Sequence, residues 1–449
     1  MHEVQTVGPQ ALLGLQTKVQ EVLDQAKKQG ASACEVSVSL SQGLSTSVRQ
    51  GEVETVEFNR DQGFGITLYD GRRKGSASTS STDAQAIKET VAAALAIARH
   101  ASEDEYSGLA DASLMATQFP ELDLWHPWNI SPEQAIEQAQ LCEQAALAFD
   151  ARISNSEGAS LNSHSSCAVY GNSHGLIAGQ AGTQHSLSCV VIAQQQGQMQ
   201  RDYWYDYARD AAQLMSPQRI GQQAAQRTVA RLGARPVTTC KAPVMFSANV
   251  AAGLFGHFLQ AISGGSLYRK SSFLLDALGQ SLFPQWLSLY ERPQLIGGLS
   301  SCAFDGDGLA TYDKDFIEKG QLVNYMLSTY SGRKLGMPST ANAGGARNLF
   351  VTHGELDQTQ IIKKMGRGLL VTELMGQGIN MVTGDYSRGA SGFWVENGEI
   401  QFPVEEVTIA GNLRDMFKSI VDVGCDLERR SSVCTGSVLL EQMMIAGRD

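Results

Sequence analysis

The stretch GLFGHFLQAISGGSLYRKSSFLLD, residues 253–276, combines an amphipathic helix with a glycine turn and a basic, aromatic segment. A helix that holds a catalytic zinc ion supplies two ligands about one turn apart, usually with a carboxylate beside the first. This stretch has one histidine, His257, and the residues one turn further on are Gln260 and Ala261. No Glu or Asp occurs from position 250 to position 275. The residues therefore predict a helix over 248–262 that has no zinc site of its own.

The composition around this stretch indicates a globular protein with two or three domains. The chain has 449 residues, of which 43% are hydrophobic and 18% are charged, and such proportions are typical of globular rather than disordered chains. Its net charge is −11, and its longest basic run is Arg72-Arg73-Lys74. Because nucleic-acid binding needs several cations on one surface, we expect no nucleic-acid partner.

The cysteines and the apolar residues predict a cytoplasmic location. The eight cysteines are dispersed and form no CxxC pair, a usage that is typical of a reduced intracellular protein. The N-terminus has no apolar core of signal-peptide length, and nowhere do about 18 apolar residues run together. We therefore expect neither export nor contact with a membrane.

Residues 1–125 predict a small α+β domain in which helices flank an antiparallel meander. A helical period precedes Gly30, and Thr82 or Asp83 is suited to cap a second helix. Between them lie short alternating runs that indicate strands. These runs are 34–40, 44–50, 52–58, 64–70 and 75–81, and they are separated by Gly43, Gly51, Gly63 and the pair Asp70-Gly71.

The rest of the chain also predicts an α+β fold. In the segment 126–235, Ser131 and Pro132 begin a helix that runs to about Phe149, and a second helix is expected over 210–232. Residues 236–449 are rich in glycine and in β-like patterns, apart from the helix at 248–262. We expect them to form a larger C-terminal domain with a central helix and a large, mostly antiparallel sheet.

The pentapeptide Gly171-Asn172-Ser173-His174-Gly175 matches the G-x-S-x-G pattern of a nucleophilic serine. That motif needs a strand before it and a helix after it. The residues that follow, LIAGQAGT, are β-like, and Asn, Ser and His between glycines suit a turn. The pattern therefore predicts a hairpin loop.

Several long segments resemble the TldD/PmbA family of metallopeptidases and are most similar to its PmbA (TldE) branch. The resemblance covers essentially the whole chain, and its motifs are long and specific. They are the segment 253–276, GGLSSCAFDGDG at 297–308, DFIEKGQLVNYMLSTYSGRKLG at 315–336, NMVTGDYSRGASGFWVENGEIQFPVEEVTIAGNL at 380–413 and TGSVLLEQMMIAG at 435–447.

The resemblance implies that the zinc ligands of the family are replaced in this chain. The metal-bearing branch carries H-E-x-x-x-H on its central helix and a cysteine near its C-terminus. When the two branches are aligned on the shared turn that ends at Lys270, Gly256 takes the first His position, His257 the Glu position and Ala261 the second His position. Cys434 is a candidate for the position of the third ligand. We expect no metal or other cofactor in this chain.

The resemblance further implies a subunit of a cytoplasmic TldD–TldE metallopeptidase. The partner would be a TldD-like chain that carries zinc, and the pair would act on peptide precursors and unfolded small proteins. This chain would assist substrate binding. The residues we expect to contact substrate are His257, Tyr268, Arg269 and Cys434.

Two other functions remain open at the level of the sequence. One is an independent peptidase with a nonstandard site, which would use His257 and Cys434. The other is a regulatory binding protein, in line with the family's older label as a modulator of DNA gyrase. The acidic charge allows binding to a protein but argues against contact with DNA. The isolated chain could also form a homodimer through the surface meant for its partner.

Overall fold

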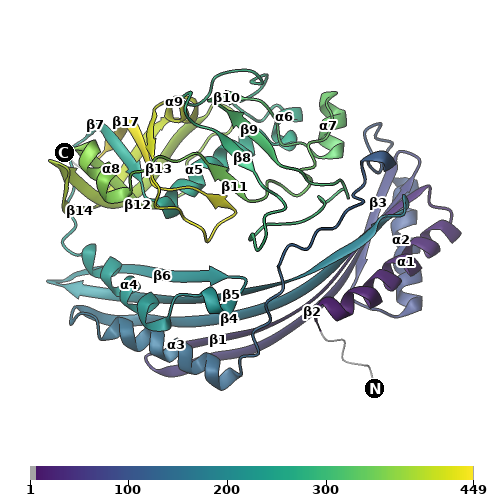
Figure 1. Cartoon of the computed structure of the whole chain (residues 1–449), viewed down its shortest axis with the longest axis horizontal. Helices are drawn as coiled ribbons and strands as arrows, with labels where there is room; N and C mark the ends of the chain where they lie inside the picture. Colours follow the sequence, from purple (N-terminus) through teal and green to yellow (C-terminus); the bar gives the residue numbers. More distant parts are fainter. Residues whose placement is uncertain (1–6, 448–449) are drawn as a thin grey trace.

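The N-terminal part of the chain is built on one curved, six-stranded antiparallel sheet (Figure 1). The computed structural model describes residues 7–447. The strands lie side by side in the order β3-β2-β1-β4-β5-β6. They are β1 (Ala33–Arg49), β2 (Glu52–Asp70), β3 (Arg73–Thr79), β4 (Ile153–Asn172), β5 (Ile177–Gln195) and β6 (Gln198–Ala208).

Two of the predicted segments contribute to this single sheet. Val38 of β1 lies opposite Val169 of β4, so strands from residues 1–125 and from residues 126–235 share a hydrogen-bonded ladder. The expected domain boundary near residue 125 stays a prediction. The antiparallel meander that the sequence predicted is present, and it is extended by three further strands.

The short strands predicted before residue 82 are wrong in their boundaries. Gly51 and Gly71 lie in turns with positive φ, as expected. Gly43 and Gly63 instead lie inside β1 and β2, where they pair with Asn59 and Ser39. A glycine inside a strand pattern does not by itself end the strand, and five predicted runs merge into three strands.

Side-chain alternation gives this sheet two different faces. Val36 and Val38 of β1 are buried beneath the helices, while Glu35 and Ser37 point to the opposite side, as expected for a period of two. Four helices cover the apolar face. They are α1 (Leu12–Lys28), α2 (Ala84–His100), α3 (Pro132–Leu147) and α4 (Pro217–Ala230), and short 3-10 turns occur at η1 (Pro9–Ala11), η2 (Ala112–Leu114) and η3 (Ala211–Gln213).

The helix starts follow local sequence signals. Asp83 caps α2 through a hydrogen bond from the Gln85 amide. Ser131 and Gln134 form a reciprocal capping box at α3, which satisfies amides that would otherwise lack a partner. The helix expected over 210–232 begins later, at Pro217, because the preceding residues form a short 3-10 turn instead.

The C-terminal part holds a second six-stranded sheet in the order β14-β13-β12-β7-β17-β15. Its neighbouring strands are antiparallel except for β7 and β12, which are parallel. The prediction of a large, mostly antiparallel sheet is therefore confirmed. The strands are β7 (Cys240–Phe246), β12 (Gly368–Met375), β13 (Asp385–Glu396), β14 (Glu399–Asn412), β15 (Ile420–Val423) and β17 (Val438–Ala446).

A smaller sheet in the order β10-β9-β8-β11-β16 and five helices complete this part. The strands are β8 (Leu289–Glu291), β9 (Lys314–Glu318), β10 (Gln321–Leu322), β11 (Leu349–Val351) and β16 (Val433–Cys434). The helices are α5 (Ala248–Ala261), α6 (Gly264–Tyr268), α7 (Thr329–Leu335), α8 (Gln358–Met365) and α9 (Leu413–Lys418).

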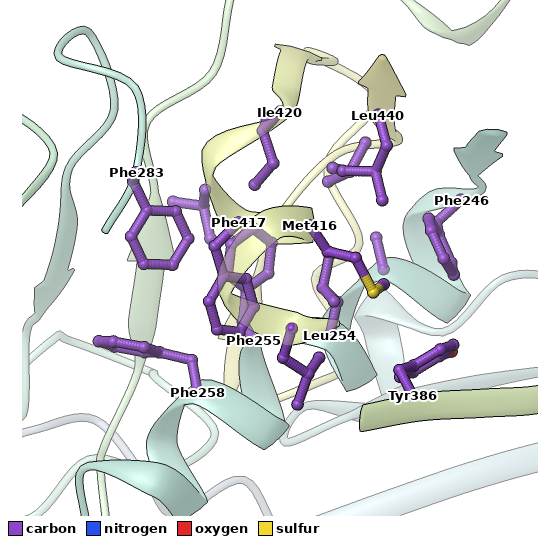
Figure 2. Close-up of a cluster of buried hydrophobic side chains, with 14 of the residues drawn as sticks. Phe246, Leu254, Phe255, Phe258, Phe283, Tyr386, Met416, Phe417, Ile420 and Leu440 are labelled. Atoms are coloured by element: carbon purple, nitrogen blue, oxygen red, sulfur yellow. The ribbon is translucent and has the colours of Figure 1, made fainter. Parts of the chain in front are cut away.

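The largest hydrophobic core surrounds α5, the predicted central helix. Figure 2 shows Phe255 and Phe258 of α5 beside Phe283 and Phe417. The ring centroids of Phe283 and Phe417 are stacked at 4.8 Å, and Phe258 meets both rings edge-on. Buried aromatic side chains supply much of the hydrophobic stabilisation of a core, so α5 is firmly fixed between α9 and the loop around position 283.

The C-terminal part lies over the inner side of the curved sheet, opposite the four N-terminal helices (Figure 1). Arginine side chains join the N-terminal part to the C-terminal part at two places. Arg231 forms a 2.6 Å ion pair with Glu373, and Arg333 donates hydrogen bonds to the carbonyls of Tyr106 and Gly108. No helix within residues 7–447 is both long and apolar enough to cross a bilayer.

Local hydrogen bonds stabilise both the turn in the G-x-S-x-G motif and the loop at Asp305. Residues 173–176 connect β4 to β5 as a hairpin, and the Ser173 hydroxyl bonds to the backbone of Cys34. The predicted hairpin is confirmed. In the loop at Asp305, the carboxylate accepts hydrogen bonds from the amides of Asp307, Leu309 and Ala343, so this carboxylate serves to hold the turn together.

Candidate functional site

The α5 helix presents one face to the core and another away from it. It directly follows β7, and the Ser247 amide at its start bonds to the Val371 carbonyl of β12. Leu254, Phe255 and Phe258 are buried. Asn249, Gly253 and Gln260 are exposed, as expected for an amphipathic helix.

The glycines on this helix lie beside open space. A Cβ atom added to Gly253 or Gly256 would meet no atom within 4 Å outside its own helix. The packing reason that usually retains a glycine in the middle of a helix is therefore absent from the described part of the chain. The outer face of α5 is thus accessible to an approaching backbone at these two positions.

Ala261 corresponds to the second zinc-binding His of the metal-bearing branch, and its environment differs from that of Gly256. Its exposed fraction is 0%, and it belongs to the core around α5. Positions 256 and 261 lie about 140° apart around an ideal α-helix. The two positions are therefore not equivalent in this chain, since one faces open space and the other is packed.

His257 is half-buried and lies near two residues of β13. Its ring lies 6.1 Å from the ring of Tyr386, centroid to centroid, in an edge-on arrangement. Tyr386 is 2% exposed, and Arg388 is near enough to act on the histidine electrostatically. Within residues 7–447, the buried Nε atom of Arg388 has no hydrogen-bond partner.

The charges of this cluster follow from burial. Burial lowers the pKa of His257, and the positive charge of Arg388 lowers it further. Burial also raises the pKa of Tyr386 to about 12, although Arg388 opposes the shift. At neutral pH the cluster therefore holds a neutral imidazole, a protonated phenol and one guanidinium, which can donate and accept hydrogen bonds with neutral or anionic groups.

Cys434 lies on β16, which is positioned against α5. Its strand pairs with β11 through Phe350. Burial raises the pKa of the Cys434 thiol, while Arg429 opposes the shift. A thiol with a raised pKa stays protonated at neutral pH and is a poor nucleophile.

Tyr268 and Arg269 follow α5 on the short helix α6 and at its end. The guanidinium of Arg269 lies over the Tyr268 ring and donates a 3.0 Å hydrogen bond to the phenol oxygen. Tyr268 in turn meets the ring of Tyr330, whose hydroxyl donates to Asp104. Among the described residues, no hydrogen bond, ion pair or ring contact joins these two residues to His257 or Cys434.

The residues on α5 do not fit the zinc ion that the resemblance assigns to the metal-bearing branch of the family. Gly256 and Ala261 have no donor atom, which leaves His257 and Cys434. Protein zinc sites use at least three side-chain ligands. Throughout residues 7–447, no three His, Cys, Asp or Glu side chains gather closely enough to hold a metal ion.

Sequence reasoning did not assign Tyr386 and Arg388 to the site. Both lie in the segment GDYSRGASGF, residues 384–393, which belongs to a long family motif but gives neither residue a role. Their position next to α5 results from the order of strands in the C-terminal sheet. The alternation of tyrosine and arginine on β13 is the one local sign that both side chains point to the same side of a strand.

Three family models match this chain in succession. The first domain of the PmbA/TldA metallopeptidases matches residues 34–98, the central domain matches residues 125–232 and the C-terminal domain matches residues 239–447. The chain belongs to the TldD/PmbA metallopeptidase family. Within that family it belongs to the PmbA branch, as the following relatives show.

The PmbA-branch relatives match over nearly their whole length. Metalloprotease PmbA of Escherichia coli O157:H7 is 53% identical over 95% of this chain and 94% of its own. A PmbA homologue of Haemophilus influenzae is 50% identical over 96% of both chains. A TldD homologue of Buchnera aphidicola is 24% identical over 38% of each chain.

Solved structures of family members have the same fold. A Bacteroides thetaiotaomicron protein named as a proposed modulator of DNA gyrase superposes with a TM-score of 0.92 at 28% identity, covering 96% of this chain and 98% of its own. TldE of Thermococcus kodakarensis superposes with a TM-score of 0.84 at 22% identity, covering 96% of this chain and all of its own. This PmbA-family chain therefore has the TldE fold.

Proposed function

We propose that this chain is the zinc-free subunit of a cytoplasmic TldD–TldE-type metallopeptidase. A TldD-like partner supplies the zinc ion and performs the hydrolysis of peptide precursors and unfolded small proteins. This chain binds the peptide beside the partner's zinc site. The observation that carries the proposal is the loss of metal donors at Gly256 and Ala261 on an otherwise intact central helix.

The outer face of α5 supports a binding role. Gly253 and Gly256 have open space beside them, so an extended peptide or the partner's backbone can approach the helix closely. His257 lies on α5 one turn after Gly253, and Arg388 of β13 is near this histidine. Together they offer an imidazole and an incompletely bonded guanidinium, which suit the carbonyl oxygens of a peptide.

An independent peptidase based on His257 and Cys434 has less support. A cysteine nucleophile is activated by a lowered pKa or by a neighbouring base. Burial instead raises the pKa of Cys434 and lowers that of His257. Both shifts favour the uncharged groups, and neither produces the thiolate that such a mechanism needs.

The test combines metal analysis with reconstitution. The isolated chain, a TldD-type subunit and their mixture are each assayed for zinc content and for cleavage of fluorescein-labelled casein, an unfolded protein. We expect cleavage from the mixture and none from this chain alone. Removal of the zinc ligands from the TldD-type subunit abolishes the activity of the mixture.

Variants of this chain separate binding from bond cleavage. We expect His257→Ala to raise the KM of the mixture by about fivefold, because one hydrogen bond to substrate is lost, and to leave kcat unchanged. Cys434→Ser leaves the zinc content of the mixture unchanged. If the isolated chain carries about one zinc ion and cleaves casein by itself, the proposal is wrong.

A further inference from the structure

A hollow of about 460 Å³ lies between the inner side of the N-terminal sheet and the loops of the C-terminal part. Strands β4 and β5 form its floor, and residues 299–306 form its opposite wall. It lies away from the α5 cluster, since none of His257, Tyr386 and Arg388 lines it. Two arginines, Arg209 and Arg347, face this hollow from different loops.

Backbone carbonyls hold the guanidinium of Arg209 in place. It donates hydrogen bonds of 2.9 Å to Gly298 and 2.6 Å to Leu299 across the boundary between the two parts of the chain. A third bond of 3.3 Å goes to Thr183. Burial lowers the pKa of Arg209, because a buried positive charge loses part of its contact with water.

Gly182 leaves the space that this guanidinium occupies. A Cβ atom at position 182 would lie 3.1 Å from Nη1 of Arg209, closer than side chains usually pack. A larger residue would displace the arginine towards the loop. The sequence of β5 thus accommodates Arg209 at the floor of the hollow.

Arg347 is fixed in a similar way. Its guanidinium donates hydrogen bonds of 3.0 Å and 3.2 Å to the carbonyls of Gly345 and Ala343. Its backbone amide bonds to Glu291, and Glu291 forms a buried 2.7 Å ion pair with Lys314. The loop that carries Arg347 is therefore anchored in the core of the C-terminal part.

Neither arginine has an acidic partner in the hollow. Among the residues that the structure describes, no carboxylate lies close enough to either guanidinium to form an ion pair. The one acid in the lining is Asp305, and its two oxygens accept bonds from three backbone amides of its own turn and the neighbouring loop. The hollow thus contains two preformed guanidinium groups whose charge is available to a ligand.

We propose that this hollow binds the terminal carboxylate of a peptide. Guanidinium groups bind carboxylates through paired, charge-assisted hydrogen bonds, and two of them held by carbonyls need little reorganisation. The inference rests on the proposed function, because it names the group of the peptide substrate that this chain holds.

The surroundings favour a peptide over a small free anion. Ser166, Gln180 and Gln184 line the floor and offer hydroxyl and amide groups to a peptide backbone. A second hollow of about 500 Å³ shares Ser37, Tyr170 and Gly306 with the first. A chain that leaves the arginines can therefore continue along the sheet.

The test measures the affinity of the full-length chain for a labelled peptide. The probe is a ten-residue Ala/Gly peptide with an N-terminal fluorescein, prepared once with a free C-terminal carboxylate and once as the C-terminal amide. Fluorescence anisotropy gives the two affinities. We expect the acid to bind about tenfold or more tightly than the amide, because charge-assisted hydrogen bonds are lost with the amide.

Matched variants locate the binding in the hollow. Gln180→Glu adds a carboxylate to the lining of the hollow that also contains the arginines, without a change in side-chain size, and it should remove the preference for the acid. Gln194→Glu makes the same change on the same strand, β5, outside the hollow, and it should retain the preference. Arg347→Gln should also remove it, with circular dichroism used to confirm folding.

The outcomes separate this inference from the proposed function. Equal affinity for the two peptide forms, or no binding of either, overturns the inference. Displacement of the peptide by acetate at a concentration equal to that of the peptide also overturns it, because the hollow would then be a site for simple anions. The proposed function is decided separately by the casein-cleaving activity of the two-subunit mixture.

Discussion

At the residue scale, Gly256 shows that α5 is not packed on all sides, since space is left beside this residue. It occupies a position within α5, where glycine costs helix stability, and it has no neighbour that requires its small size. Nothing that packs around α5 within residues 7–447 requires a glycine at this position.

The substitution Gly256→Ala should therefore stabilise the isolated chain by about 1 kcal/mol, since alanine is the better helix former and its methyl group enters open space. Urea denaturation measures the free energy of unfolding. The matched control is Gly221→Ala on α4, where a Cβ atom would lie 2.0 Å from the Cys142 carbonyl oxygen. That variant should be destabilised, and a loss of stability in Gly256→Ala would contradict the structure.

Two histidines make stability depend on pH. His185 is 0% exposed, and burial lowers its pKa, as it does for His257. The unfolded chain, with histidine pKa values near about 6.5, takes up these protons first as the pH falls. The stability that the two neutral histidines contribute to the folded chain is complete above about pH 6.5, and it is lost as the pH falls towards their pKa values in the folded chain.

We expect the free energy of unfolding to decrease between about pH 7.5 and about pH 5.5. His185→Gln should show a smaller decrease over this range, since one titrating group has been removed. Denaturation curves recorded at several pH values give the comparison. An unchanged slope in the variant would show that His185 is not the group responsible.

At the residue scale the sequence identified a helix with one histidine but not the cluster around it. His257 is visible because a lone imidazole on an apolar helix is unusual. Tyr386 and Arg388 lie more than a hundred positions further on, and only strand pairing places β13 beside α5. Long-range pairing of this kind has no local sequence signal.

At the scale of elements, helix ends and turns follow the sequence closely. Ser131 precedes Pro132 in the predicted helix start, and the structure shows the expected capping box. The turn at Ser173 was also predicted from its glycines and asparagine. The lengths of the strands were not predicted. Gly43 was expected to end a strand, but it continues β1 in an extended conformation next to His164, whose ring nitrogen would lie 3.3 Å from a Cβ atom at position 43.

The paired helices α3 and α4 offer a comparison of two serine caps. Ser131 accepts a hydrogen bond at the start of α3, whereas Ser216 makes no side-chain cap bond at the start of α4. Ser131→Ala should cost about 1 kcal/mol of stability, and Ser216→Ala should cost clearly less. Thermal and urea denaturation of both variants checks this, and equal losses would contradict the assigned capping geometry.

At the scale of the whole molecule, buried charges connect the smaller C-terminal sheet to the loop that carries Arg347. The side chains of Lys314 and Glu291 are 3% and 1% exposed and form a 2.7 Å ion pair between β9 and β8. Asn342 also donates to the Glu291 carboxylate. Removing one partner of a buried pair leaves the other charge uncompensated.

Lys314→Met should therefore destabilise the chain by about 3 kcal/mol or more. The double variant Glu291→Gln, Lys314→Met should recover part of this loss, because no unpaired charge remains. Arg201→Gln breaks the exposed ion pair with Glu157 and should cost at most about 1 kcal/mol. A loss as small for Lys314→Met as for Arg201→Gln would show that the buried pair is not important for stability.

The overall architecture was only partly predictable at this scale. The α+β class and the antiparallel sheets follow from alternating patterns and turn residues. The pairing of β1 with β4 in one sheet could not be predicted in this way, because nothing in the local sequence around Val38 and Val169 indicates that they pair. The arginine hollow depends on this arrangement, because its floor and its opposite wall come from distant parts of the chain.

The pairing of β1 with β4 also affects how the protein is made. While the nascent polypeptide leaves the ribosome, β1 and β2 can form a hairpin early, but the other edge of β1 has no partner until β4 has been synthesised. Open strand edges promote aggregation. Translation of residues 101–131, which lie between α2 and α3, is therefore the interval in which chaperones would contribute most to the yield of this protein.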